Sequence, residues 1–497
     1  MKERLRKYLH TIFTLDLRAL ALFRIFLAVV LIGDISVRFS DLQAFYSNQG
    51  VLPLDVMHEG NYFSPFSISV HMMNGALWFQ TILVALAYVF AICMLVGYRT
   101  RLFTFLSFFM LFSIQTRNPL VLQGGDDFLR LLLFWAIFLP SNRVWAVDAI
   151  GRGRPGSYKQ FDIANIGYVL LLFSVYFFTS LMKHSPEWYR DGTALYYAFS
   201  IDQMVYPASK LLYPYPNLLK ALTFGTIGLE LIAPLLLLIP YKPQVFKTIF
   251  VVGLTMLHVG IGLTMQVGYF FIISIVGMIG LWPEVFFRPL ERLFDRLSRN
   301  SLIKWFLHVF QPRYVTKPRL KRLTNTVMVS AIGLSLVWNI GNVAKIPQGM
   351  RSVVLPVGKL TGLSQNWGMF APTVFKGDGW YVYEAITESG DTIDILKPET
   401  SIDYSKPEWV VYQYKNAKWR KLGENLMRSK NKSIRTPFCR YQLTNHNRNH
   451  PDQKIWKLNV LYFREKSLPN YEVEDIEKGK ICSCFLKNKG KETASIE

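Results

Sequence analysis

The chain has 497 residues, of which 51% are hydrophobic, and it carries a formal net charge of +22. That length is typical of two or three soluble domains, but before residue 345 the apolar residues gather in runs too long for soluble helices. A basic chain can be a nucleic-acid-binding protein, yet here the basic residues lie in short segments between the apolar runs. Composition therefore excludes an ordinary soluble protein, and we expect no nucleic-acid partner.

The apolar runs predict a bundle of about nine transmembrane helices. A hydrocarbon core about 30 Å thick requires roughly 20 apolar helical residues, and lipid leaves no partner for open backbone groups, so each run should be helical. The first run could instead be a cleaved signal peptide, but Arg24 and Asp34 interrupt it and no small-residue cleavage site follows. We therefore expect it to be a membrane anchor. The expected spans lie near residues 17–36, 77–97, 102–117, 127–145, 165–183, 217–240, 245–264, 267–283 and 325–345.

The distribution of Lys and Arg predicts the orientation of the bundle in the lipid bilayer. The segment 284–324 holds ten Lys/Arg against three Asp/Glu, whereas the segment 37–76 holds a single Arg against three Asp/Glu. Short cytoplasmic loops carry the excess of Lys and Arg. Nine spans then place the N-terminus in the cytoplasm and the C-terminal part outside it.

Two further features complete the expected domain organisation. Residues 286–310 carry arginines at three- to four-residue steps with Phe and Leu between them, which predicts a basic amphipathic helix in the headgroup layer. We therefore expect a membrane bundle over 1–285, a cytoplasmic linker over 286–324, a last transmembrane helix over 325–345 and a small β-rich extracytoplasmic domain over 346–497.

The expected β-rich domain contains short alternating runs separated by turn signals. We expect strands at Trp380–Tyr383, Trp409–Tyr412 and Lys457–Tyr462. In an extracytoplasmic domain a disulfide from Cys439 to either Cys482 or Cys484 is possible. We expect no metal site, because no CxxC pair or His cluster has ligand spacing.

Ionisable residues inside the expected helices are the candidate functional residues, because each is costly in lipid and needs a partner, a cavity or a function. The candidates are Asp126, Asp127 and Arg130 at the start of the fourth helix, Lys183 at the outer end of the fifth, Glu230 in the sixth and His258 in the seventh.

Structural interpretations exist for the three central candidates. A terminal lysine such as Lys183 often extends its amine to the membrane surface. Glu230 and His258 could form a mutual hydrogen-bonded pair that holds two helices together.

The fourth helix allows a structural interpretation as well. Asp126 or Asp127 with Arg130 has the spacing of a salt bridge at a helix start. Arg24 most simply pairs with one of these carboxylates. No nucleophile elbow, phosphate-binding glycine loop or HExxH motif supports a soluble type of hydrolase, kinase or zinc protease.

The segment Lys183–Tyr196, in which a lysine precedes a Trp-x-x-x-Gly stretch, resembles a segment of vitamin K-dependent γ-glutamyl carboxylases. It is also similar to the wider family of bacterial HTTM (horizontally transferred transmembrane domain) proteins. The resemblance extends over most of residues 10–385, and a Gln365–Pro372 stretch resembles the soluble tail of bacterial members. The other matching segments are Gly97–Phe103, Gly125–Arg130, Trp145–Asp148, Glu230–Pro234, His258 and Gly379–Val382.

The resemblance implies a carbon–carbon bond-forming enzyme of the bacterial cytoplasmic membrane. Lys183 would be the base that deprotonates a vitamin K-type hydroquinone, and O₂ and CO₂ would be co-substrates in the carboxylation of glutamate in an exported peptide. A lysine base has to be uncharged, and a water-poor chamber favours the uncharged amine. His258 would hydrogen-bond a quinone oxygen or a developing oxyanion.

Around that base the resemblance implies a quinone pocket. Glu230 and His258 would tune it, and Asp126, Asp127 and Arg130 would shape its outer rim. The chain departs from the carboxylases where their histidine near the fourth helix is replaced by Asp126, where Met182 and His184 rather than a second lysine flank the base, and in its shorter tail.

These departures keep a second hypothesis open, a non-catalytic membrane accessory for the maturation or export of a secreted peptide. A transporter is a third option, but the sequence shows no inverted repeat and no pair of broken helices.

Overall fold

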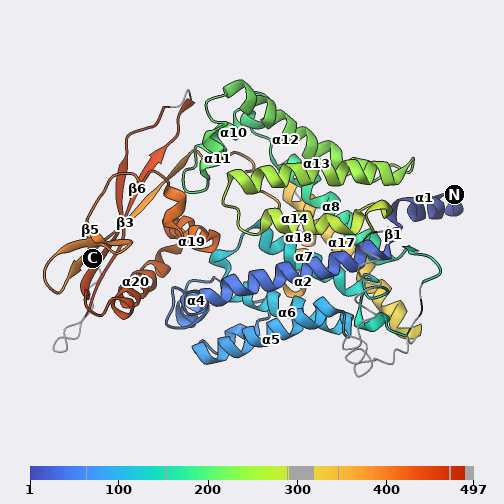
Figure 1. The fold of residues 1–497 in the computed structure, drawn as a ribbon, viewed down its shortest axis with the longest axis horizontal. Coiled ribbons are helices and arrows are strands. Elements are labelled where there is room, and N and C mark those ends of the chain that lie inside the picture. Colours follow the sequence, from blue (N-terminus) through green and yellow to red (C-terminus); the bar gives the residue numbers. More distant parts are fainter. Residues whose placement is uncertain are drawn as a thin grey trace.

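The computed structural model describes residues 1–62, 64–151, 153, 155–287, 289, 318–344, 346–469 and 472–486. It consists of a helical bundle with a β-sheet at one end, and the first helix, α1, lies at the opposite end (Figure 1). We call these two ends of the bundle the sheet end and the α1 end. The amphipathic helix predicted over 286–310 falls mostly in residues 290–317, which lie outside the described residues.

The long and short helices of the bundle follow the order of the predicted apolar runs. They are α1 (Lys2–Phe13), α2 (Leu17–Ser40), α3 (Leu42–Tyr46), α4 (Leu54–Glu59), α5 (Leu77–Val96), α6 (Thr100–Arg117), α7 (Gly124–Phe138), α8 (Ile163–Met182), α9 (Pro186–Tyr189), α10 (Ala194–Phe199), α11 (Pro207–Lys210), α12 (Pro216–Leu236), α13 (Pro243–Thr264), α14 (Phe270–Met278), α17 (Pro318–Val343) and α18 (Gln348–Thr361).

Six of these helices, α2, α5, α8, α12, α13 and α17, are long and apolar enough to cross a membrane. Two of them carry a continuous row of large apolar side chains on the outside of the fold, and such a row is stable in lipid and not in water. The chain is therefore a membrane protein. The rows are Trp78, Ile82, Leu86, Val89 and Ile92 on α5, and Val245, Ile249, Val252, Met256, Val259 and Leu263 on α13.

The other three predicted spans correspond to the shorter helices α6, α7 and α14, so six of the nine expected spans are helices long and apolar enough to cross a membrane. α7 ends at Phe138 because Leu139 precedes a proline and takes an extended conformation. α14 has nine residues and continues as a 3₁₀ turn, Ile279–Leu281. α7 packs against α2, α6, α8 and α14 and is largely buried, so most of its surface contacts protein.

The C-terminal part carries one five-stranded antiparallel sheet in the order β5-β4-β3-β6-β7. The central pair β3–β6 runs from Gly377 opposite Lys466 to Thr387 opposite Ile455. α20 (Arg435–Asn449) packs on β6 and β7, while α19 (Ala417–Met427) lies against the bundle. The strands are β3 (Gly377–Thr387), β4 (Thr392–Asp394), β5 (Lys397–Ser401), β6 (Ile455–Lys466) and β7 (Glu477–Phe485).

One of the three predicted strands is wrong. Trp380–Tyr383 lies in β3 and Lys457–Tyr462 in β6, but Val410–Gln413 forms a short 3₁₀ helix, η6. A four-residue apolar run cannot by itself distinguish the two conformations. The side chain of Gln413 takes the place of a neighbouring strand there, accepting a hydrogen bond from the Tyr381 amide at 3.2 Å and donating to its carbonyl at 3.0 Å.

The segment between α18 and β3 is built into the bundle. Trp367 is fully buried, with its ring edge-to-face against Phe128 at a centroid distance of 5.9 Å. The Thr179 hydroxyl of α8 donates to the Trp367 carbonyl at 3.0 Å. The sheet itself therefore begins only at Gly377, well after the expected domain boundary at 346.

Candidate functional site

Lys183 and Glu230 form a buried ion pair near the sheet end of the bundle. Lys183 directly follows α8, and its Nζ donates to Glu230 Oε2 on α12 at 2.6 Å. Only 4% of Lys183 and 7% of Glu230 is exposed. The interpretation that Lys183 extends to the membrane surface is therefore wrong, because its amine has a carboxylate partner inside the bundle.

The turn after α8 places an aromatic ring over this amine. α8 stops at Lys183, and Pro186 begins the short helix α9, a position where proline's fixed φ favours a helix start. The turn brings the ring of Trp188 back to 4.3 Å from Lys183 Nζ. Trp188 Nε1 in turn donates to the Phe370 carbonyl at 3.0 Å, so the segment after Trp367 helps to fix this ring.

His258 on α13 pairs with a tyrosine and not with Glu230. Its Nε2 lies 2.9 Å from the hydroxyl of Tyr176 on α8. The ring of Phe270 stands edge-to-face against the imidazole at 5.3 Å. The alternative of a mutual Glu230–His258 pair is therefore wrong. His258 Nδ1 is buried and has no hydrogen-bond partner in the part of the chain that the structure describes.

We call Lys183, Glu230, Trp188, Tyr176 and His258 the Lys183 cluster. Tyr176 lies within electrostatic range of Glu230, which places the Tyr176–His258 pair near the ion pair. The sequence pointed to three of the five residues and missed Tyr176 and Trp188. Tyr176 had a usable signal, since it lies seven residues before Lys183 and therefore on the same helix face. Trp188 had none.

Asp127 and Arg130 form the helix-start salt bridge expected from their spacing, at 2.8 Å. Arg130 also donates to the carbonyls of Gly362 and Ser364, at 2.8 and 2.7 Å. Arg130 therefore holds the buried segment that contains Trp367, and it contributes to the Lys183 cluster by positioning that segment.

Asp126 belongs to a different cluster, where the C-terminal part meets the bundle. Arg38 of α2 contacts Asp126 and also donates to Asp34 at 2.6 Å and to the Tyr46 hydroxyl at 2.8 Å. Lys418 of α19 inserts its Nζ between the same two carboxylates, 3.1 Å from Asp126 and 3.4 Å from Asp34. Asp126 thus holds α19 against the bundle through its ion pair with Lys418.

Arg24 does not pair with these carboxylates, so that prediction is wrong. It donates to the carbonyls of Ser141 and Trp145, at 2.9 and 2.5 Å. Arg24 lies 14 residues before Arg38 on α2, about 20 Å along the helix at 1.5 Å per residue. It therefore lies toward the α1 end, while the carboxylates lie at the sheet end.

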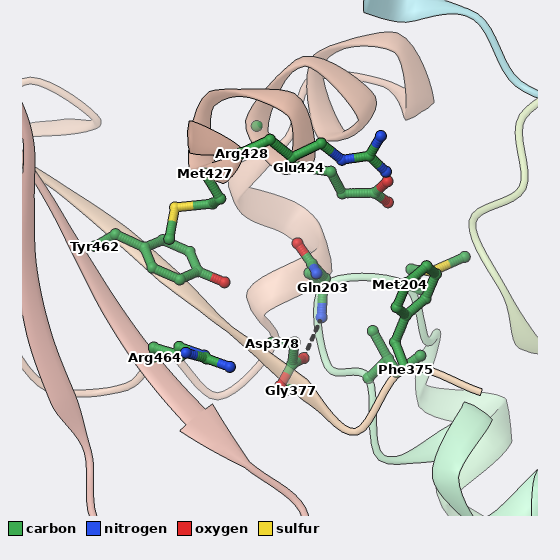
Figure 2. A pocket seen from close by; sticks show the side chains of 12 residues that line it. Gln203, Met204, Phe375, Gly377, Asp378, Glu424, Met427, Arg428, Tyr462 and Arg464 are labelled. Atoms are coloured by element: carbon green, nitrogen blue, oxygen red, sulfur yellow. Dashed lines mark hydrogen bonds between the residues drawn. The ribbon is translucent and has the colours of Figure 1, made fainter. Parts of the chain in front are cut away.

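A cavity of about 360 Å³ lies where the segment 201–204 meets the sheet and α19, and we call it the junction pocket. Gln203 and Asp378 both line it, and the backbone N–H of Gln203 donates to Asp378 Oδ2 at 3.2 Å (Figure 2). Arg428 and Arg464 also line it. The pocket combines carboxylates, guanidinium groups and apolar side chains from two parts of the chain.

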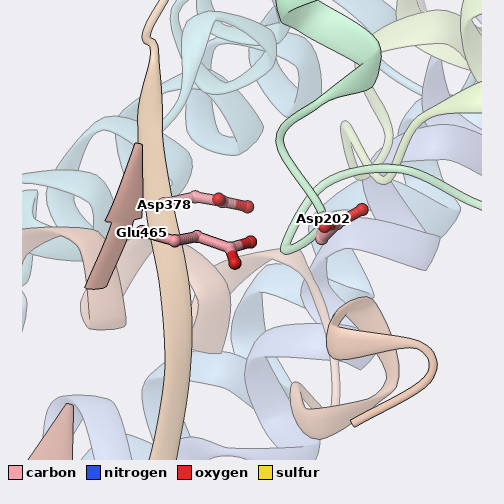
Figure 3. Close-up of side chains that lie close together, drawn as sticks. All are labelled: Asp202, Asp378 and Glu465. Carbon is pink, nitrogen blue, oxygen red and sulfur yellow. The ribbon is translucent and has the colours of Figure 1, made fainter. Parts of the chain in front are cut away.

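Three carboxylates meet beside this pocket. Asp202, Asp378 and Glu465 bring carboxylate oxygens within 4.8 Å of one another (Figure 3). Lys406 balances two of the charges, pairing with Asp202 at 2.6 Å and with Glu465. Burial, with the neighbouring charges of Asp202 and Glu465, raises the pKa of Asp378 from its ordinary 3.8 to about 8.

Among the residues that the structure describes, these three carboxylates are the group close enough together to hold a metal ion. Their spacing in the sequence did not indicate that they meet. The expectation of no metal site was based on short-range motifs, whereas these ligands come from positions far apart in the sequence. At neutral pH Asp378 holds a proton, and Lys406 and Lys210 supply two positive charges against those of Asp202 and Glu465, so the trio is balanced by protein groups. We therefore assign no metal to it.

Three cysteines gather on the sheet. Cys439 of α20 is buried, with its Sγ 3.6 Å from the Leu458 carbonyl, and hydrogen bonds link its thiol to those of Cys482 and Cys484 on β7. The hydrogen bond with Cys482 is the main cause that raises the pKa of the Cys439 thiol. All cysteines are free thiols here, and both disulfide pairings predicted from the sequence stay open.

The chain has no match among protein-family models, curated proteins or solved structures. Its Lys183 cluster joins an amine to a carboxylate at 2.6 Å and a phenol to an imidazole at 2.9 Å. Such pairs can accept, pass on and donate protons in a space with little water.

Proposed function

We propose that this chain is a carboxylase-like membrane enzyme of the HTTM type, which uses a vitamin K-type hydroquinone and acts on an exported peptide with Lys183 as base. The observation that carries the proposal is the buried Lys183–Glu230 pair under the Trp188 ring. An ionisable pair inside a membrane bundle is costly, and function is its default explanation.

Glu230 gives Lys183 a route to its uncharged form. Transfer of one proton across the 2.6 Å bond leaves a neutral amine beside a neutral carboxylic acid. Two neutral groups suit a low-dielectric interior better than two separated charges do. The amine then accepts the hydroquinone proton.

His258 supplies the group that fits a quinone oxygen. When the Tyr176 hydroxyl donates to Nε2, the proton of the imidazole is on Nδ1, which is buried without a partner among the described residues. That N–H is free to donate to a carbonyl or phenolate oxygen. When bound, the hydroquinone would react with O₂ and supply the stronger base that drives carboxylation of glutamate by CO₂.

Access to the cluster requires side chains to move. Lys183 is 4% exposed and His258 is 2% exposed, and Lys183 lines none of the cavities described in this article. Trp188 is the side chain directly over the amine, so we propose that it moves when the hydroquinone enters from the bilayer.

The proposal includes a topology in which all nine helices cross the bacterial cytoplasmic membrane. α1 would lie in the cytoplasm and the sheet outside, with α6, α7 and α14 crossing as shorter, protein-enclosed helices. Two observations support this orientation: the excess of Lys and Arg in alternate loops, and the location of α1 and the sheet at opposite ends of the bundle (Figure 1). Accessibility labelling of single cysteines at Lys2 and at Lys457 in intact cells tests it, and labelling of both from outside would contradict it.

The test of the chemistry is a quinone-dependent assay with matched variants. We expect the purified chain to retain a quinone detectable by mass spectrometry, and to incorporate labelled CO₂ into peptide when the quinone is reduced. Lys183→Ala should abolish incorporation, whereas Lys220→Ala, at an exposed lysine on α12, should leave it unchanged. Undiminished activity in Lys183→Ala would exclude Lys183 as the base.

The second candidate function is a non-catalytic accessory for the maturation or export of a secreted peptide. The burial of the Lys183–Glu230 pair favours it, because a purely structural pair would be buried in the same way. Replacing both partners by apolar residues often preserves stability, so Lys183→Met/Glu230→Leu separates the two functions. A folded double variant that still supports peptide export would favour the accessory, and one that has lost it would favour the enzyme.

A further inference from the structure

The helix α18 has an exposed apolar stripe that points away from the protein. Its residues recur at steps of three and four, which keeps them on one face of a helix with 3.6 residues per turn. α18 packs beside α17, whose Val327, Val329 and Ile340 are also exposed. The stripe therefore continues the lipid-facing surface of α17. It consists of Met350 (46% exposed), Val353 (63%), Val357 (39%) and Leu360 (49%).

The opposite face of α18 borders a separate cavity of about 670 Å³, which we call the α18 pocket. Arg351, Ser352 and Lys359 line it from the helix, and Tyr62 and Phe66 line it from the facing loop. Its volume is in the range of ligand-binding pockets. None of the described residues that line it is acidic.

The two cations of the α18 pocket are not neutralised by the protein. Arg351 and Lys359 are exposed, and neither side chain has a hydrogen-bond or ion-pair partner among the residues that the structure describes. Several other basic residues at the sheet end have a carboxylate partner, as Lys415 has with Asp41 at 2.7 Å. Two unpaired cations facing one cavity without acids indicate an anionic ligand.

The wall opposite α18 is fixed by the C-terminal part. The Tyr62 hydroxyl lies 2.7 Å from Ser433 Oγ, in the short helix η7 (Ser429–Ile434) that precedes α20. Arg130 anchors the other side, because its Nε donates to the carbonyl of Gly362 directly after α18. The pocket is therefore held between two elements that are each tied to the rest of the molecule.

We propose that the α18 pocket binds the headgroup of an anionic phospholipid from the leaflet at the sheet end. An amphipathic helix with an apolar stripe in the acyl region carries its basic face at headgroup level, where phosphates lie. The acyl chains would lie along the stripe of α18 and the exposed face of α17. The proposal rests on the membrane orientation proposed above and is independent of the chemistry at Lys183.

Native mass spectrometry of the detergent-purified full chain tests this proposal, with phosphatidylglycerol and phosphatidylcholine as probes. We expect the wild type to retain phosphatidylglycerol preferentially. Arg351→Gln/Lys359→Gln should weaken that retention about thirtyfold, since each basic residue near an anionic lipid surface contributes about 1 kcal/mol. The conservative Arg351→Lys/Lys359→Arg variant should keep most of it, which also shows that the helix still folds.

Lys457→Gln/Lys480→Gln is the matched control, because it removes the same charge from β6 and β7, where Lys457 is half-buried and Lys480 is exposed. An equal loss in this control would overturn the proposal, since net charge alone would then explain binding. Equal retention of phosphatidylcholine would also overturn it. Displacement of the lipid by an equal concentration of inorganic phosphate would assign the pocket to a soluble anion and overturn the lipid assignment.

Discussion

The Lys183 cluster and the carboxylates at the junction pocket both bury charge, but they neutralise it differently. In the bundle one amine meets one carboxylate at 2.6 Å. At the junction, Lys406 faces two carboxylates and the third, Asp378, has its pKa raised to about 8 by burial, with the neighbouring carboxylates Asp202 and Glu465 adding to the shift. A low-dielectric interior requires neutrality, and protein groups achieve it either by pairing or by holding a proton. The first arrangement suits proton transfer within the membrane, and the second makes stability depend on pH.

The largest expected effect is that of breaking the pair in the bundle. Glu230→Leu leaves the Lys183 ammonium buried without a partner and should lower the free energy of unfolding by about 3–5 kcal/mol. Lys183→Met/Glu230→Leu should recover most of that loss, because both charges are gone. Denaturant unfolding in mild detergent measures both. Equal losses in the single and double variants would show that the pair is not buried as a unit.

The second-largest expected effect is a dependence of the free energy of unfolding on pH, caused by Asp378 at the junction pocket. The folded chain keeps a proton on Asp378 that the unfolded chain has already released, so the free energy of unfolding should fall as pH rises from about 4 to 8. Asp378→Asn removes this term and should be more stable than the wild type at pH 9, by on the order of 2 kcal/mol or more. Thermal unfolding between pH 5 and 9 measures it, and parallel curves for the two proteins would contradict the raised pKa.

A smaller effect is expected for Lys406→Gln. This change leaves Asp202 with Lys210 as its remaining partner, at 2.8 Å, and Glu465 with less compensation. The Lys406 side chain is 34% exposed, so solvent screens the pair and we expect a loss of about 1 kcal/mol at pH 7. The pKa of Asp202 lies below its ordinary 3.8, because Lys406 and Lys210 outweigh the effect of burial, so the loss should shrink only as the pH falls below about 4. A loss independent of pH would point to packing instead of charge.

The smallest effect concerns the ring over the amine. Trp188→Phe keeps an aromatic face near Lys183 but removes the hydrogen bond to the Phe370 carbonyl, so we expect a loss of about 1 kcal/mol or less. The same variant should alter the rate of quinone binding if Trp188 moves on entry. Stopped-flow binding measures that rate, and an unchanged rate would mean that entry does not pass this side chain.

The sequence identified candidate residues better than their partners. Lys183, Glu230 and His258 stand out because ionisable groups are rare in apolar runs. Their contacts could not be predicted from the sequence, because Glu230 lies 47 residues from Lys183. The same holds for Lys418, which lies 292 residues from Asp126 and looked like an ordinary basic residue of a soluble tail.

The sequence by itself determined the membrane character, the order of the helices and the two longest strands, because length, apolarity and alternation are local properties of a chain. Only the tertiary structure decided that Glu230 faces Lys183, that Asp126 docks α19, and that Asp202, Asp378 and Glu465 converge. The physical reason is that the cost of burying a charge depends on the residue itself, whereas its compensation depends on which distant group the fold brings within about 3 Å.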